Sequence, residues 1–237
     1  MISDAFELLG PARTPGGRLY TCEHASNRVP RPHRPRPADR RLLAMHWGYD
    51  IGAANVTRWL VAHDAGSWGV LSRFSRLLID PNRDPDDPTA ILTHCDEGAP
   101  TFNRRHVASD RVARFHAPFH SALAEAVAAK PRALVSIHSF TPVFRGAGRQ
   151  MEAGVLYDAH DPWAERLVET LRAEGLRTEA NQPYSGKDGL IYSAARHGDA
   201  AGVPYLEIEL RQDLIASRRD AARIAAKVLR GLSAAGV

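Results

Sequence analysis

The sequence predicts an α/β protein, with a mostly parallel or mixed central sheet and helices on both faces in three layers. Strand-like apolar runs alternate with amphipathic, helix-like segments along the whole chain, a pattern typical of such sheets. The run at 133–139 is continuously apolar and β-branched, as in a parallel strand buried on both faces. No repeat or linker divides the 237 residues, so we expect one domain spanning 1–237.

The first third of the chain should place two strands around a helix. Residues 1–17 show little periodicity, and the turn signal Pro15–Gly17 precedes a strand at 18–23. Four prolines between 30 and 37 exclude a helix there. The remaining elements expected in this third are a short helix at 38–46, a helix from 51 to about 63 and a strand at 68–74.

The rest of the chain repeats the alternation of strands and helices. The stretch 77–80 suits a short strand or an extended arm, and a long irregular segment follows it. Apolar residues at helical spacing predict a continuous helix over 104–129, ended by Lys130-Pro131. The later expected strands are 133–139, 154–157, 176–179 and 203–210, and the later expected helices are 161–174, 190–201 and 217–232.

Composition restricts the cellular context. No apolar run approaches the ~20 residues that cross a bilayer, and the first residues lack the layout of a signal peptide. We therefore expect a cytoplasmic protein with no membrane partner. The two cysteines, Cys22 and Cys95, imply no disulfide framework.

The formal net charge is +4, and it comes almost entirely from arginine. The arginines are scattered and interleaved with acids, whereas a nucleic-acid surface clusters basic residues with aromatics. We therefore expect no nucleic-acid partner. Arginine binds carboxylates with two hydrogen bonds, so the composition suits a small anionic substrate.

Three predicted strands end in residues that bind metals or move protons. His24 follows the first strand, His138 ends the run at 133–139, and Glu209 ends the strand at 203–210. In open α/β sheets, ligands bind just beyond the carboxyl ends of the strands. The competing interpretation of His138, a core histidine bonded to its neighbours, is weakened by this coincidence of three strand ends.

A catalytic zinc ion takes three protein ligands and leaves one position open. His24, Asp50 and His138 can supply that set; Asp50 opens the helix after the first strand and could alternatively be an N-cap. Asn27, three residues after His24, is the alternative third ligand, but its neutral oxygen binds zinc poorly.

A carboxylate outside the metal ligands should accept the proton of the attacking water. Glu207 and Glu209 point to the same face of their strand, and we assign the catalytic role to Glu209 because it lies nearer the strand end. The other histidines that might compete are interpreted as surface or helix-face residues: His94, His106, His116, His120 and His197. No Gly-x-Ser-x-Gly elbow and no glycine-rich phosphate loop follows a strand.

With these residues identified, the chain resembles the N-formylglutamate amidohydrolase (deformylase) family. The matching stretches spread over most of the length, and together they are specific. They are 22–27 (CEHASN), His46 with 49–53 (YDIGA), 79–83 (IDPNR), 136–140 (SIHSF), 183–185 (PYS) and 204–214 (PYLEIELRQDL).

The resemblance implies a phosphorylase/hydrolase-like fold and one zinc ion, with cleavage of an N-formyl or related N-acyl amino acid such as N-formyl-L-glutamate to formate and the amino acid. That activity belongs to histidine degradation. More distantly, His24, His138 and Glu209 occur in the order of the metal and base residues of zinc carboxypeptidases. Cell-wall amidases of similar topology take a carboxylate ligand from their first helix, which supports Asp50.

Substrate contacts are expected from the loops around the predicted site. Asn82-Arg83 resembles the carboxylate-binding pair of the zinc carboxypeptidases, and Arg83 is our first candidate for the substrate carboxylate. Arg145 and Arg211 are further candidates, although Arg211 could instead form a salt bridge. Tyr184, in a turn-rich loop, could cover the site. Two alternative functions stay open: a carboxypeptidase-like or cell-wall-type amidase, and a non-catalytic small-molecule binding protein.

Overall fold

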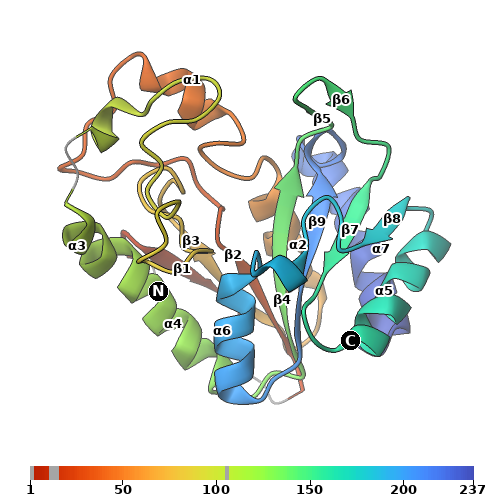
Figure 1. Cartoon of the computed structure of the whole chain (residues 1–237). Helices are drawn as coiled ribbons and strands as arrows, with labels where there is room; N and C mark the ends of the chain where they lie inside the picture. Colours follow the sequence, from red (N-terminus) through yellow and green to blue (C-terminus); the bar gives the residue numbers. More distant parts are fainter. Residues whose placement is uncertain (1–2, 11–15, 105–106) are drawn as a thin grey trace.

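A seven-stranded sheet forms the centre of the molecule (Figure 1). The computed structural model describes residues 3–10, 16–104 and 107–237. The strand order is β1-β3-β2-β4-β9-β7-β8, and β5 and β6 pair separately as a hairpin. The strands are β1 (Phe6–Leu9), β2 (Arg18–Cys22), β3 (Trp68–Ser72), β4 (Ala133–Phe140), β5 (Val143–Phe144), β6 (Ala147–Gly148), β7 (Ala153–Leu156), β8 (Thr178–Ala180) and β9 (Tyr205–Arg211).

The direction of the strands confirms the expected mixed, mostly parallel sheet. The four central strands β3, β2, β4 and β9 run parallel. β1 is antiparallel to β3, and β7 is antiparallel to β9 but parallel to β8. The carboxyl ends of β2, β4 and β9 therefore lie side by side at one edge of the sheet.

Helices cover both faces of the sheet, which confirms the three layers. The helices α2, α5 and α7 pack together on one face, and α4 and α6 pack on the other (Figure 1). Their bounds are α1 (Asp39–Ala44), α2 (Ala53–His63), α3 (Ala108–Arg111), α4 (Ala117–Val127), α5 (Asp161–Ala173), α6 (Tyr192–Ala201) and α7 (Arg218–Ala234). Short 3₁₀ turns lie at Thr101–Asn103, Gly186–Asp188 and Gln212–Leu214, and a π-helical segment lies at Val112–His116.

Alternation along the central strands divides the apolar core into two layers. In β4, Val135 and Ile137 belong to the layer under α2, α5 and α7, whereas Leu134 belongs to the layer under α4 and α6. Ser136 and His138 occupy the Leu134 side of β4, because successive side chains point to opposite faces. On that side, the sheet changes from apolar to polar toward the carboxyl ends of its strands.

Two local expectations about the chain were incomplete. Residues 6–9 form β1, an edge strand, although residues 1–17 show little periodicity; the strand is stabilised by pairing with β3 rather than by its own pattern. Residues 77–80 form no strand, because the hydroxyl of Ser75 and the backbone bond from Leu78 to Ser75 close a turn there. The hairpin β5–β6 was not predicted.

The helix expected over 104–129 is interrupted. Residues 105–106 lie outside the described chain, and the π-helical segment Val112–His116 separates α3 from α4. Pro118 lies in the first turn of α4 and has no N–H to donate to a preceding carbonyl. The π-helical segment lies directly before this proline, where one backbone hydrogen bond of a regular helix cannot form. Hydrophobic periodicity alone does not detect such a segment.

No helix among the described residues is long and apolar enough to cross a membrane.

Gly52 allows the chain to turn sharply between Asp50 and α2. Its φ is +87°, in the left-handed region, and it caps the N-terminus of α2. A Cβ at this position would lie 2.3 Å from the carbonyl oxygen of Ile215. The position therefore requires glycine for both backbone conformation and space.

We expect Gly52→Ala to lower the free energy of unfolding by about 2–4 kcal/mol, because it adds a steric clash to backbone strain. Gly189→Ala is the matched control: its φ is +73° but no atom lies within 4 Å of the added Cβ, so it should cost only about 1 kcal/mol. Urea denaturation measures both variants, and equal losses would contradict this account of Gly52.

Candidate metal centre and active site

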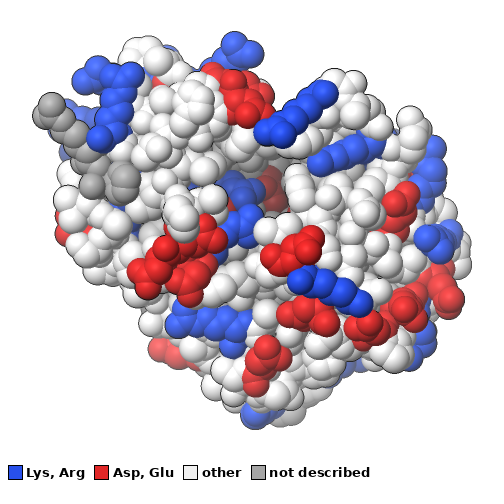
Figure 2. Space-filling model, in the orientation of Figure 1, with Lys and Arg blue, Asp and Glu red and all other residues white. Residues whose placement is uncertain are grey.

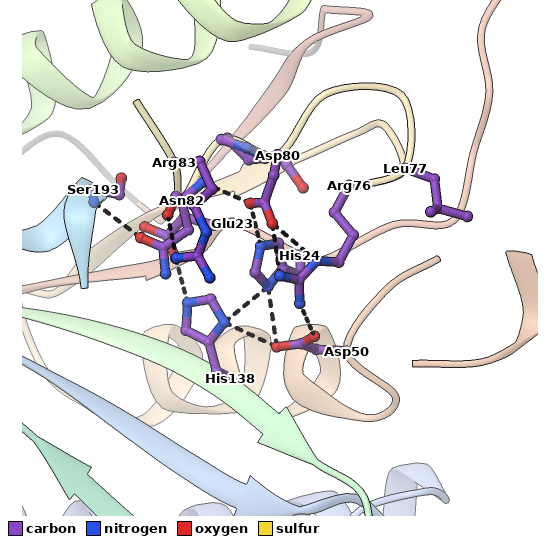
Figure 3. A network of polar contacts seen from close by, with 12 residues as sticks. Glu23, His24, Asp50, Arg76, Leu77, Asp80, Asn82, Arg83, His138 and Ser193 are labelled. Carbon is purple, nitrogen blue, oxygen red and sulfur yellow. Dashed lines mark hydrogen bonds and ion pairs between the residues drawn. The ribbon is translucent and has the colours of Figure 1, made fainter. Parts of the chain in front are cut away.

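Three side chains converge at the carboxyl edge of the sheet (Figure 3). The Nδ1 atom of His138 lies 3.0 Å from Nδ1 of His24 and 2.9 Å from Oδ2 of Asp50, and the His24–Asp50 distance is 3.4 Å. Zinc–nitrogen bonds of about 2.0–2.1 Å in a tetrahedral site place neighbouring ligand atoms about 3.3 Å apart. All three residues are buried, so the predicted trio has the spacing and burial of a metal site.

Each imidazole is oriented from behind by a carboxylate. His24 Nε2 lies 2.7 Å from Oδ1 of Asp80, and His138 Nε2 lies 3.0 Å from Oε2 of Glu23. Although burial raises the pKa of Glu23, its bonds from His138, Ser136 and Thr21 hold that pKa at about 2. Carboxylates in this position fix the tautomer with hydrogen on Nε2 and leave Nδ1 free to ligate.

The orientation of these groups fits a bound cation. With hydrogen on both Nε2 atoms, the two Nδ1 lone pairs and a carboxylate oxygen face each other with no proton between them. Although burial lowers the pKa of His138, the carboxylates of Glu207, Asp50 and Glu23 raise it well above its usual value. The surroundings therefore favour a positive charge at this point, as a metal ion or as a proton on His138. Arg76 pairs with two of the surrounding carboxylates, Asp50 and Asp80. Five buried carboxyl groups surround the point: Glu23, Asp50, Asp80, Glu207 and Glu209.

Glu207 and Glu209 lie beside the trio on the same face of β9. Burial raises the pKa of Glu207 to about 7 and that of Glu209 well above its usual value. Glu207 accepts a hydrogen bond from the amide of Asn82 and lies 3.4 Å from His138. The buried Oε2 of Glu209 has no hydrogen-bond partner among the described residues. Glu209 therefore keeps an oxygen available to a ligand.

A cavity of about 210 Å³ opens over this cluster. Its floor includes His24, Asp50, His138, Glu207 and Glu209. One wall comes from the α1 side of the sheet, with His46 and Trp47, and the other from the β5–β6 side, with Phe144 and Tyr184. The space-filling view shows the hollow near the middle of the face, with basic surface inside it (Figure 2). The basic residues that line it are Arg76 and Arg83.

Three of the five residues predicted to contact substrate line this cavity. Arg83, Asn82 and Tyr184 lie in its wall. The amide of Asn82 is already bonded to Leu190, Glu207 and Ser193, so this side chain braces the wall. Tyr184 is 37% exposed at the mouth, where it lies against Arg149.

The structure places the other candidates away from the centre. Arg145 is exposed in the β5–β6 hairpin and pairs with Asp96. Arg211 pairs with Asp213 and donates to backbone carbonyls at 149–151, which fits the salt-bridge alternative. Asn27 is exposed, whereas Asp50 lies within the buried trio.

Sequence reasoning gave no role to the groups behind the ligands. Glu23 and Asp80 lie in motifs that were noticed, but only the fold shows that they face imidazoles. Arg76 contacts Asp50 at 3.5 Å and Asp80 at 2.6 Å. It belongs to no motif and was not predicted, although its spacing of four residues from Asp80 could have suggested an ion pair.

Three histidines interpreted as surface or helix-face residues are in fact buried. His116, His120 and His197 form one cluster between α4 and α6. His94 is exposed as expected, and His106 lies outside the described residues.

Comparisons with known proteins point to one family. A sequence model of N-formylglutamate amidohydrolases matches residues 17–216. The structure of the gene product Atu2144 from Agrobacterium tumefaciens is 31% identical with a TM-score of 0.89, and covers 98% of this chain and 95% of its own. An N-formylglutamate amidohydrolase from Ralstonia eutropha is 20% identical with a TM-score of 0.76, covering 99% and 98%.

A metallo-carboxypeptidase from Burkholderia cenocepacia is more distant. It is 12% identical with a TM-score of 0.46, covering 98% of this chain and 60% of its own. This likeness is too weak to bear on function. A search of proteins with curated functions gave no match.

The family match and the buried cluster define the class: a hydrolase with an α/β fold that acts on a linear amide and carries a candidate metal site built from His, Asp and Glu. Within that class, the family model covers most of the chain. The chain belongs to the N-formylglutamate amidohydrolase family.

We expect Asp80→Asn to weaken zinc binding about 10–100-fold, because the carboxylate that orients His24 is lost. Asp64→Asn is the matched control. Asp64 also accepts bonds from buried residues, Arg18 and Tyr20, but these lie near the start of β2, away from the cavity. Competition with a chromogenic chelator measures the affinity. An unchanged affinity in Asp80→Asn, or an equal loss in Asp64→Asn, would count against this role.

Proposed function

We propose that this protein is a zinc-dependent amidohydrolase that removes the formyl group from an acidic amino acid such as N-formyl-L-glutamate. The observation that carries the proposal is the convergence of two Nδ1 atoms and one carboxylate oxygen within 3.4 Å. His24, Asp50 and His138 would hold one zinc ion. Family membership supports the reaction class, and it favours an enzyme over a non-catalytic binding protein.

Zinc in this position would acidify a water molecule and polarise the formyl carbonyl. The chain itself must then move protons. Glu209 would accept the proton of the attacking water at its unpartnered Oε2 and later deliver it to the departing amino nitrogen. Glu207 is held by Asn82, although it also lies near His138 and Glu209 in a group that could hold a metal ion; we therefore assign the base to Glu209.

The cavity suits a compact anionic substrate. Its volume, about 210 Å³, is below the 300–1,000 Å³ typical of pockets for drug-sized ligands. Arg83 lines it, and the bond from its Nη1 to the carbonyl of Asn82 leaves other guanidinium N–H groups free to bind a carboxylate. Arg76 is committed to Asp50 and Asp80. We therefore assign the substrate carboxylate to Arg83, and Tyr184 at the mouth would shield the bound substrate.

We expect Glu209→Gln to lower kcat by about 10²–10⁴-fold, because the amide cannot accept the proton. The variant should keep the zinc content of the wild type, since Glu209 is not a ligand in this proposal. Formate release and elemental analysis measure the two quantities. Glu179→Gln, at an exposed glutamate of β8, is the control and should change neither; loss of zinc from Glu209→Gln would refute the assignment.

We expect Arg83→Met to raise KM for N-formyl-L-glutamate by about 10–100-fold, because a charge-assisted bond to the carboxylate is lost. Arg230→Met removes a surface arginine that pairs with Glu174 and should leave KM unchanged. Initial rates on a panel of N-formyl amino acids test both variants. Equal KM values in Arg83→Met and the wild type would show that another residue binds the carboxylate.

A further inference from the structure

The segment that carries Arg83 has no regular structure of its own. Residues 81–83 form a turn directly after Asp80, the carboxylate that orients His24. The backbone carbonyls of 81–83 are not paired in the sheet or in a helix. An arginine on such a turn can hold a substrate in register with the metal centre only if something else fixes its backbone.

Side chains provide that fixation at each of the three carbonyls. The carbonyl of Pro81 accepts from Nε2 of His120 at 3.0 Å, and that of Arg83 accepts from Nε2 of His116 at 3.0 Å. The carbonyl between them, of Asn82, accepts from the Arg83 guanidinium. The turn is thus held from the α4 side by two imidazoles and from the sheet side by Asp80, which accepts from the backbone N–H of Asn82.

The two imidazoles belong to a buried, mutually oriented cluster. His120 bonds to Pro81 through Nε2–H, so its Nδ1 carries a lone pair and accepts from Nε2–H of His197 at 2.8 Å. The rings of His116 and His120 lie 4.2 Å apart. All three are at least 94% buried, and burial lowers their pKa values, to about 3 for His120 and about 4 for His197. The cluster is therefore neutral, and its donors and acceptors keep fixed roles.

The backbone of the helix places this cluster. His116 ends the π-helical segment and His120 lies one turn later in α4, so both project from the same side of the helix. The π-helical segment Val112–His116 lies directly before this turn of α4. The π-helical segment thus lies beside the two histidines that donate hydrogen bonds to the turn at 81–83.

We infer that His116 and His120 are positioning residues: they clamp the backbone of 81–83 and thereby hold the Arg83 guanidinium where the substrate carboxylate binds. The inference rests on the proposed function, in which Arg83 contacts that carboxylate. Neither histidine touches the substrate, and both act through Arg83.

The test compares His116→Asn with His116→Gln. Glutamine carries an N–H donor near the position of Nε2 and can keep the bond to the Arg83 carbonyl, whereas the amide of asparagine falls short. We expect His116→Asn to raise KM for N-formyl-L-glutamate about tenfold with less than about a threefold change in kcat, and His116→Gln to stay within about threefold of the wild type in both. His63→Asn, which removes an exposed imidazole bonded to the backbone carbonyl of Trp59, is the control and should change neither constant.

A double-mutant cycle separates positioning from general stability. In an Arg83→Met background, adding His116→Asn should change KM by less than about twofold, because the clamp acts through the arginine that is already gone. A tenfold effect in both backgrounds, or equal damage from asparagine and glutamine, would overturn the inference. If His116→Asn does not fold, the same comparison is made with His120→Gln and His120→Asn.

Binding measurements keep this inference separate from the proposed function. The Kd of N-formyl-L-glutamate is measured by titration calorimetry in the Glu209→Gln protein, with and without His116→Asn. A wild type that releases no formate would refute the proposed function, while a tenfold weaker Kd on adding His116→Asn would still support the clamp. If the Glu209→Gln protein does not bind N-formyl-L-glutamate, or binds it equally well with and without His116→Asn, the clamp is rejected.

Discussion

The site depends on the convergence of two imidazole nitrogens and a carboxylate oxygen, which meet at distances of 2.9–3.4 Å and favour a positive charge between them. Glu23 and Asp80 impose it, because each accepts the Nε2 proton of one histidine and so turns the Nδ1 lone pair inward. Burial strengthens every one of these interactions, since the local dielectric constant is low. The carboxylates behind the imidazoles therefore decide where an ion can bind, and the rest of the cavity is arranged around that point.

Much of this site could be predicted from the sequence, because its central residues lie at the ends of strands. His138 and Glu209 follow apolar, β-branched runs, and the parallel order of such strands brings their carboxyl ends to one edge. Asp50 was harder, since an aspartate before a helix is usually a cap. In the structure it lies before Gly52, the residue that caps α2, and its side chain is free to face the histidines.

The parts that were missed depend on contacts between residues distant in the sequence. Arg145 was a reasonable candidate by type, but the β5–β6 hairpin carries it to the surface and into a pair with Asp96. The helical pattern around Phe115 and Phe119 gave the correct buried face, yet it could not show the π turn. The burial of His116 and His120 followed from neither pattern nor propensity. It depends on the turn at 81–83 arriving from the opposite side and offering carbonyl oxygens to both rings.

The pairing of β4 with β9 places His138 directly opposite Glu209, and Ser136 opposite Glu207. Adjacent strands of a sheet are about 4.8 Å apart, so backbone hydrogen bonds set the spacing of the two positions from which the ligand and the proposed base project. The ladder fixes which residues lie opposite each other, and a slip of one residue would turn both glutamates into the opposite apolar layer. The ladder between two strands therefore keeps the candidate ligand and the proposed base in register, whatever segments line the mouth of the cavity.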